Sequence, residues 1–239
     1  MQETLTKKIL KISLLVIFVL IIFAVAFLYF FLKNKKNYFY SDREVYIVFS
    51  DKDTNQIKLK DSQDLVKNLG GSGEIYCNDG VYYLTLSVYE SLEDAESVKE
   101  NVSQIFQNVD ILKLKIKPLS RALKNEVAKN NDLFNFLVFN KSFISEIVNY
   151  QIKYLAGQIT DKNIICFFID CKMKIDDFIK VFNQKETEIQ KLTNKVCNEM
   201  MLYIDNFLAN FFESSKKNSL VTNLAVNIVT SYLEYINNL

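Results

Sequence analysis

One stretch limits the architecture of this chain more than any other: residues 12–32 read ISLLVIFVLIIFAVAFLYFFL, without a charged side chain. A helix needs about 20 consecutive apolar residues to cross the hydrocarbon core of a bilayer. The stretch therefore predicts a transmembrane helix. A cytoplasmic tail at 1–11 would precede it and a juxtamembrane linker at 33–43 would follow it.

The orientation of this helix does not follow from the flanking charges, because three lysines precede the stretch and three follow it. The short tail and the long remainder favour a single-pass cell membrane protein with its N-terminus inside and its C-terminal part outside. The alternative is a cleaved signal peptide, since Ala24-Val25-Ala26 has the small-residue pattern of a cleavage site. The apolar residues that follow, FLYFFL, favour the uncleaved anchor.

Composition argues against several classes of function. The chain has no histidine, the commonest general base and metal ligand. Beyond Lys36 it carries 23 basic and 27 acidic residues, a net charge of −4, which is a poor match for nucleic acid. The acids around the loop at 51–61 lack the glycine and terminal glutamate of an EF-hand. The expectation is a protein that is not an enzyme and needs no metal or cofactor.

The chain has four cysteines, and their spacing matches no zinc site: Cys77, Cys166, Cys171 and Cys197. If the domain lies outside the cell, Cys166 and Cys171 could form a disulfide. The alternative is that the cysteines are small buried free thiols.

Residues 44–118 alternate between strand and helix patterns. Apolar, β-branched runs at 45–50, 73–78 and 109–117 and the alternation over 82–87 predict strands, and Asn78-Asp79-Gly80 is typical of a hairpin turn. Helices are expected at 61–69 and after Ser91, where S-x-x-D has the spacing of a capping box. The resulting order is β-α-β-β-α-β, a ferredoxin-like arrangement in which strands one and three lie centrally.

Two crossover helices must cover one face of such a sheet, because their apolar stripes need burial. We expect the other face to be open and to carry the candidate binding residues, which are Tyr46, Val48, Tyr83, Thr85, Lys113 and Lys115. Two alternatives stay open. Tyr83 could be an ordinary cross-strand residue covered by later helices, and the two lysines could be a simple solvated strand face.

From residue 119 to 239 the strand alternation gives way to helical periodicity. One or two helices are expected over 121–157, a long helix over 175–213 and a last amphipathic helix over 220–239. The apolar run at 164–171, IICFFIDC, fits a strand or a buried helix equally well. The fold class expected for the chain is α+β: an N-terminal transmembrane helix, the βαββαβ domain, and an all-α C-terminal region.

The stretch GVYYLTLSVYESLEDAESVKENV, from Gly80 to Val102, resembles the second half of a SPOR domain, the sporulation-related repeat. The family's pattern is approximately a glycine, an aromatic-led strand, a turn, a serine and a helix that starts Glu-Glu-Ala. Several positions fit it: Gly80, Tyr82, Leu84, Leu86, Tyr89, Ser91, Glu93, Asp94 and Ala95. The first half, VYIVFS to DLVKNL, fits more loosely, so the resemblance spans 44–118.

The resemblance implies a bacterial cell-envelope protein that binds the glycan strands of peptidoglycan on the open sheet face and acts in cell division or sporulation. The glycan-binding candidates are the six residues of that face. The alternative is a membrane-anchored interaction protein with a degenerate SPOR fold, in which the helices at 119–239 recruit a protein partner. Nucleic acid is not expected as a partner in either case.

Overall fold

The computed structural model describes residues 43–116, 119, 121–183 and 187–239. The chain divides into two compact units, Met1–Asp42 and Arg43–Leu239. The anchor predicted at 12–32 lies outside the described residues. Among the residues that are described, no helix is both long and apolar enough to cross a membrane.

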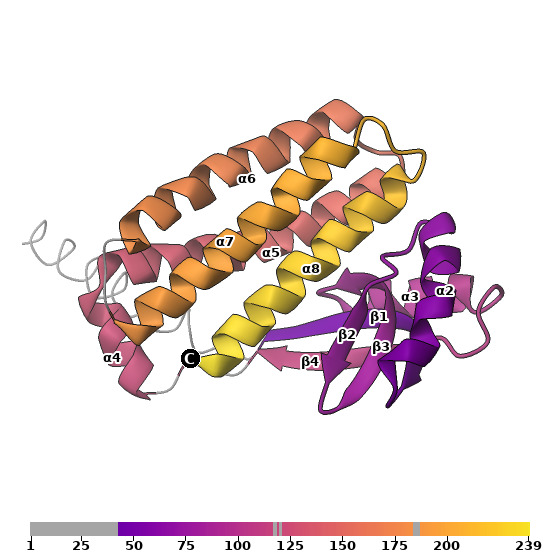
Figure 1. Cartoon of the computed structure of the whole chain (residues 1–239), viewed down its shortest axis with the longest axis horizontal. Coiled ribbons are helices and arrows are strands. Elements are labelled where there is room, and N and C mark those ends of the chain that lie inside the picture. The colour runs from indigo at the N-terminus through magenta and orange to yellow at the C-terminus, as the bar shows by residue number, and fades with distance from the viewer. Residues whose placement is uncertain (1–42, 117–118, 120, 184–186) are drawn as a thin grey trace, which may run out of the picture. The chain divides into compact units, whose positions relative to one another are not determined.

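The second unit is a mixed α+β structure (Figure 1). Its N-terminal half has the expected βαββαβ order: β1 (Arg43–Asp53), α2 (Gln56–Asn68), β2 (Ile75–Asn78), β3 (Val81–Tyr89), α3 (Leu92–Val102) and β4 (Asp110–Ile116). The C-terminal half is helical: α4 (Arg121–Lys129), α5 (Asn131–Leu155), α6 (Asp161–Phe182), α7 (Glu188–Asn210) and α8 (Lys217–Asn238).

The four strands form one antiparallel sheet in the order β2-β3-β1-β4, so β1 and β3 are central as predicted. Asp79 and Gly80 lie between the paired residues Asn78 and Val81 and join β2 to β3. Both have positive φ, 49° and 77°. Positive φ at both central residues is the geometry of a type I′ turn. The predicted Asp-Gly hairpin is confirmed.

One face of the sheet is covered by the two crossover helices. A buried cluster joins Leu59 and Val66 of α2 and Ala95 of α3 to residues of the sheet. The sheet residues in this cluster are Tyr46, Val48, Leu84, Leu86 and Tyr89. The cap predicted for α3 is present, because the Ser91 hydroxyl accepts a hydrogen bond from the main-chain N–H of Asp94 at 3.3 Å.

The opposite face is covered by the C-terminal helices, mainly by α5 and α8. Its buried residues on the two central strands are Val45, Ile47, Phe49, Thr85 and Val88. Polar contacts fix the helices in place: Gln151 of α5 donates to the carbonyl oxygen of Val88, and Asn223 of α8 donates to the Glu74 carboxylate. The middle of the central strand β1 is therefore buried on both faces.

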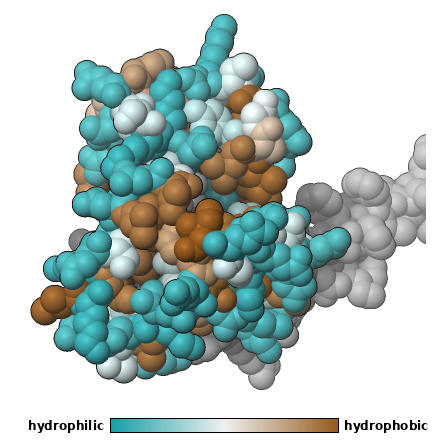
Figure 2. Space-filling view, turned by 90° about the vertical axis from the view of Figure 1, so that its right-hand side faces the viewer, coloured by the Kyte–Doolittle hydropathy of each residue, from teal (hydrophilic) through white to brown (hydrophobic). Residues whose placement is uncertain are grey.

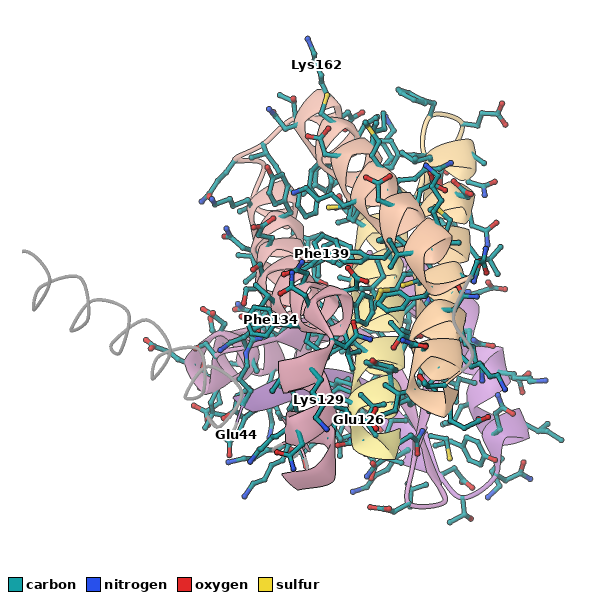
Figure 3. The ribbon with its side chains drawn as sticks, turned by 90° about the vertical axis from the view of Figure 1, so that its left-hand side faces the viewer. Glu44, Glu126, Lys129, Phe134, Phe139 and Lys162 are labelled. Carbon is teal, nitrogen blue, oxygen red and sulfur yellow. The ribbon has the colours of Figure 1, made fainter. Side chains whose placement is uncertain are left out.

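Aromatic side chains fill the space between the helices. Phe136 of α5 meets Phe178 and Phe182 of α6 and Tyr235 of α8 edge to face, with ring centroids 5.4, 5.8 and 5.7 Å apart. Phe139, one turn away on α5 and labelled in Figure 3, packs against Phe178 with ring centroids 5.5 Å apart. Each edge-to-face pair contributes about 0.5–1.5 kcal/mol to stability beyond the effect of the buried area.

Two sequence-based boundaries were wrong. The single helix expected over 175–213 is two helices, because α6 ends at Phe182 and α7 starts after Thr187, whose side chain forms a capping box with Gln190. The helix expected at 61–69 starts earlier, at Gln56, because Asn55 caps it by accepting a hydrogen bond from the N–H of Ile57. The ambiguous run at 164–171 lies inside α6 and is helical.

Candidate functional site

The six predicted binding residues do not share one face. Tyr46 and Val48 lie among the residues that pack against α2 and α3, with 7% and 0% of their surface exposed. Thr85 is fully buried on the other face, and Tyr83 is half-buried there. We expected these six residues to share one open face, and this prediction was wrong. The described part of the sheet has a helical layer on each side.

A bulge in the central strand pair separates the six residues. Register shifts occur between Val48 and Phe49 and again between Phe49 and Asp51. An extra residue in one strand reverses the alternation of side chains beyond it. Tyr83 therefore pairs with Lys52, and Thr85 with Phe49. Our expectation that Tyr46 and Thr85 share a face holds only for an unbroken register.

Thr85 has a structural role. Its hydroxyl donates to the main-chain oxygen of Glu74 at 2.9 Å, and its N–H donates to the same oxygen at 2.8 Å. These bonds hold the segment before β2 against β3. The residue is 0% exposed and has no access to an external ligand in this structure.

Lys113 and Lys115 are exposed at the edge strand, as the alternation of β4 predicted. Lys113 donates to the Glu44 carboxylate at 2.8 Å, and the Tyr46 hydroxyl donates to the same oxygen at 2.6 Å (Glu44 is labelled in Figure 3). These two bonds lower the pKa of Glu44 and raise the pKa values of Lys113 and Tyr46. The exposed Lys113 thus forms an ion pair with Glu44 of the same sheet.

A short strip of the second face stays accessible. Tyr83 is directly paired with Tyr76 on one side and with Lys52 on the other, so the three side chains share a face. Both tyrosines are half-buried and Lys52 is exposed. The Tyr83 ring meets Phe49 edge to face at 5.0 Å. Burial, with the nearby Glu234 carboxylate as a smaller cause, raises the pKa of Tyr76 to about 12. We refer to Lys52, Tyr76 and Tyr83 as the aromatic strip.

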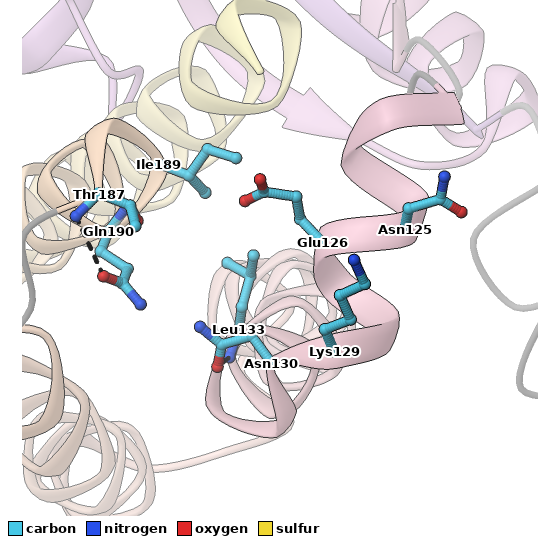
Figure 4. Close-up of a pocket in the computed structure, with 8 residues that line it drawn as sticks. All are labelled: Asn125, Glu126, Lys129, Asn130, Leu133, Thr187, Ile189 and Gln190. Atoms are coloured by element: carbon cyan, nitrogen blue, oxygen red, sulfur yellow. Dashed lines mark hydrogen bonds between the residues drawn. The ribbon is translucent and has the colours of Figure 1, made fainter.

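A first pocket of about 300 Å³ lies between α4, the start of α5 and the start of α7 (Figure 4). Its charged groups are Glu126 and Lys129. Three further polar groups are occupied at helix starts: Asn130 accepts from the N–H groups of Asp132 and Leu133, and Thr187 forms the capping box of α7 with Gln190. Asn125 is exposed on α4. Much of the polar lining of this pocket thus belongs to the helix starts that meet there.

A second pocket of about 340 Å³ lies between α7, α8 and the segment before β2. Its polar lining consists of Glu74, Tyr203, Asn206, Asn210, Asn223 and Asn227. We refer to it as the asparagine pocket. Neither sequence periodicity nor motif spacing identified it, because its residues come from three segments that are remote in sequence.

An apolar area lies on the side of the molecule formed by α2 and α3, at the right of Figure 1. Figure 2 shows brown side chains gathered between hydrophilic areas on this side. Exposed apolar residues lie on the two helices, namely Ile57, Leu65 and Leu92, and at the C-cap of α2, namely Leu69. Val66 of α2 is buried, whereas Leu65 and Leu69 are 53% and 49% exposed.

No group of three or more metal-ligating side chains gathers anywhere in the described ranges. The four cysteines are free; Cys77 and Cys166 are exposed, and Cys171 and Cys197 are buried. Burial raises the pKa of both buried thiols to about 12. Cys166 and Cys171, which could have formed a disulfide, are not bonded to each other in this structure.

Comparisons with known proteins give little beyond this geometry. No family model matches the chain, and no curated protein matches it in sequence. A solved structure, the peptidoglycan-binding domain of the B. subtilis cell wall lytic enzyme CwlC, aligns with 13% identity over 32% of this chain and 95% of that chain. Its TM-score is 0.26, which is too low to establish a shared fold.

Proposed function

We propose that this chain is a non-enzymatic, membrane-anchored interaction protein of the cell envelope. In this proposal its βαββαβ module is a scaffold, and its C-terminal helices recruit a protein partner. The observation that carries the proposal is the covered sheet: α5 and α8 occupy the face that a free glycan-binding module would leave open, and Thr85 is 0% exposed. The anchor is the predicted helix at 12–32, with the C-terminal part outside the cell.

The surface proposed for the partner is on α6. Cys166, Ile169 and Met173 are exposed and recur at helical spacing, so they form one apolar stripe. Ile169 is 44% exposed and Met173 is 65% exposed. Methionine adapts its shape to different surfaces, which suits a contact with an apolar patch on another protein.

A second candidate function is binding of peptidoglycan glycan strands through the aromatic strip, in division or sporulation. The observation that favours it is that Tyr76, Tyr83 and Lys52 are direct neighbours on one face and are not covered completely. Aromatic rings stack on the apolar faces of sugars, and an ammonium group donates hydrogen bonds to hydroxyls and carboxylates.

One pair of measurements separates the two functions. Purified peptidoglycan stripped of stem peptides is sedimented with the full chain in detergent, alongside Tyr83→Ala and Lys52→Ala. Lys115→Ala is the matched control, because Lys115 is also exposed but lies on a different strand and face. The interaction proposal expects little sedimentation and no effect of any variant. Sedimentation that Tyr83→Ala and Lys52→Ala abolish and Lys115→Ala retains would establish the glycan function instead.

The partner surface is tested with a photo-crosslinking amino acid placed at Ile169 or Met173 in the native cell. The same discrete crosslinked species is expected from both positions. Lys195 on α7 is the control position, since its side chain is 73% exposed. If positions 169 and 173 give only the pattern seen at 195, the helices do not present a partner surface there.

A further inference from the structure

The asparagine pocket has a composition that helix packing does not require. Four asparagines line it in two pairs spaced by one helical turn: Asn206 and Asn210 on α7, and Asn223 and Asn227 on α8. Asparagine is a poor helix former, because its side chain competes for main-chain hydrogen bonds. Asn206 and Asn210 are exposed and the other two are half-buried, so the pocket opens to the outside.

Only part of the hydrogen-bonding capacity in this pocket is used. Asn223 donates to the Glu74 carboxylate at 2.5 Å, and Asn227 donates to the side-chain oxygen of Asn223 at 2.9 Å. Asn210 donates to the main-chain oxygen of Asn206 at 2.7 Å. Within the described ranges, the side-chain amide of Asn206 and the hydroxyl of Tyr203 have no hydrogen-bond partner.

The inner wall of the pocket is apolar. Phe207 and Leu224 are 3% and 2% exposed, and the half-buried Leu220 completes this wall. A pocket with an apolar wall and a few convergent polar groups is the usual form of a small-molecule site, and about 340 Å³ is at the small end of the range for such sites.

The charge of the pocket lining restricts the kind of ligand that can bind. Glu74 is the one carboxylate that lines the pocket, and no lysine or arginine belongs to the described lining. An anionic ligand would meet Glu74 without a compensating cation, and burial of an unpaired charge is costly. Primary amides offer donors and acceptors side by side, which matches vicinal hydroxyl groups and amide groups on a ligand.

We infer that the asparagine pocket binds a neutral, hydroxyl-rich ligand with the size of a single sugar ring. The Asn206 amide and the Tyr203 hydroxyl supply the free hydrogen-bonding groups, and the apolar wall takes the C–H face of the ring. The site is separate from the aromatic strip and from the α6 stripe. The inference therefore goes beyond the proposed function and stands or fails independently of it.

Saturation-transfer difference NMR on the full chain in detergent tests this inference, with the signal observed on the sugar. The neutral probes are glucose and N-acetylglucosamine, and gluconate is the anionic probe. Transfer to at least one neutral sugar is expected, with a Kd on the order of 1 mM, and no transfer to gluconate. Absence of transfer to both neutral sugars, or stronger transfer to gluconate, would overturn the inference.

Variants assign the binding to this pocket. Asn206→Ala and Tyr203→Phe each remove one free hydrogen-bonding group and are expected to weaken binding about 3- to 10-fold. Asn198→Ala is the matched control, because Asn198 is also an exposed asparagine of α7 but does not line the pocket. Tyr83→Ala should leave sugar binding unchanged. Equal affinities in Asn206→Ala, Tyr203→Phe and Asn198→Ala would place the sugar elsewhere.

Discussion

Gln151 of α5 donates a hydrogen bond from its side-chain amide to the main-chain carbonyl oxygen of Val88 on β3, at 3.2 Å across 63 residues of sequence. Both residues are fully buried. The side-chain oxygen of Gln151 has no hydrogen-bond partner among the described residues. This hydrogen bond connects the helical layer to the sheet. Among the described residues, no other polar group of α5 bonds to Val88.

Gln151→Glu is expected to destabilise the protein at neutral pH by about 3–5 kcal/mol, because it buries an unpaired carboxylate beside a carbonyl oxygen. Burial raises the folded-state pKa of such a carboxyl above its unfolded value. The loss of stability should therefore be smallest at acidic pH and grow as pH rises through the folded-state pKa. Urea unfolding at several pH values measures this.

The matched control for that variant is Asn149→Asp, an amide-to-acid change two residues away on the exposed side of α5. Exposed substitutions usually change stability by less than about 0.5 kcal/mol. If Gln151→Glu and Asn149→Asp have the same pH profile, position 151 is accessible to water and the helical layer does not seal this face.

Thr85→Lys tests the covered face directly. Thr85 is 0% exposed and bonded to the main chain of Glu74, so a lysine there has to bury its ammonium group or displace the C-terminal helices. A cost on the order of 3–5 kcal/mol, or loss of cooperative unfolding, is expected. Thr54→Lys, at an exposed position after β1, should be neutral. Thermal unfolding followed by circular dichroism separates the two outcomes.

Part of this fold could be predicted from local sequence. The alternation of β4 placed its lysines outward, and the Asp-Gly turn and the Ser91 cap were found where expected. These features depend on contacts within a few residues, and the residue types that form them are specific. The helix start within 175–213 also has a local signal, the capping box of Thr187 and Gln190. We missed it because the apolar residues keep a helical spacing across the break.

The covered sheet was harder to predict, because it depends on contacts between segments far apart in sequence. The run VYIVFS in β1 is apolar without alternation, which is typical of a strand buried on both faces. Both faces bear this out: Ile47 and Phe49 are 0% and 3% exposed on one face, and Val48 is 0% exposed on the other. The bulge next to Val48 could not be predicted from composition, and it decides which face Thr85 occupies.

The cysteines should fall into two reactivity classes. The thiolate is the reactive form, and burial holds the pKa of Cys171 and Cys197 at about 12, so both stay protonated near pH 8. Cys77 and Cys166 are exposed. A thiol-reactive dye should label those two in the native protein and all four in denaturant. Rapid native labelling of Cys171 or Cys197, located by mass spectrometry, would contradict the packing of α6 and α7.

The last prediction concerns the start of α7. Thr187 accepts a hydrogen bond from the N–H of Gln190 at 3.4 Å, and Gln190 accepts one from the N–H of Thr187 at 3.3 Å. Thr187→Ala removes one of these bonds and should cost about 1 kcal/mol in the free energy of unfolding, whereas Thr187→Ser keeps the hydroxyl and most of the stability. Urea unfolding measures both, and hydrogen exchange shows where the change occurs. Faster exchange confined to the first turn of α7 is the expected result for the alanine variant, because the cap satisfies N–H groups that have no partner inside the helix. If alanine and serine are equally stable and exchange equally, the capping box does not set the boundary between α6 and α7.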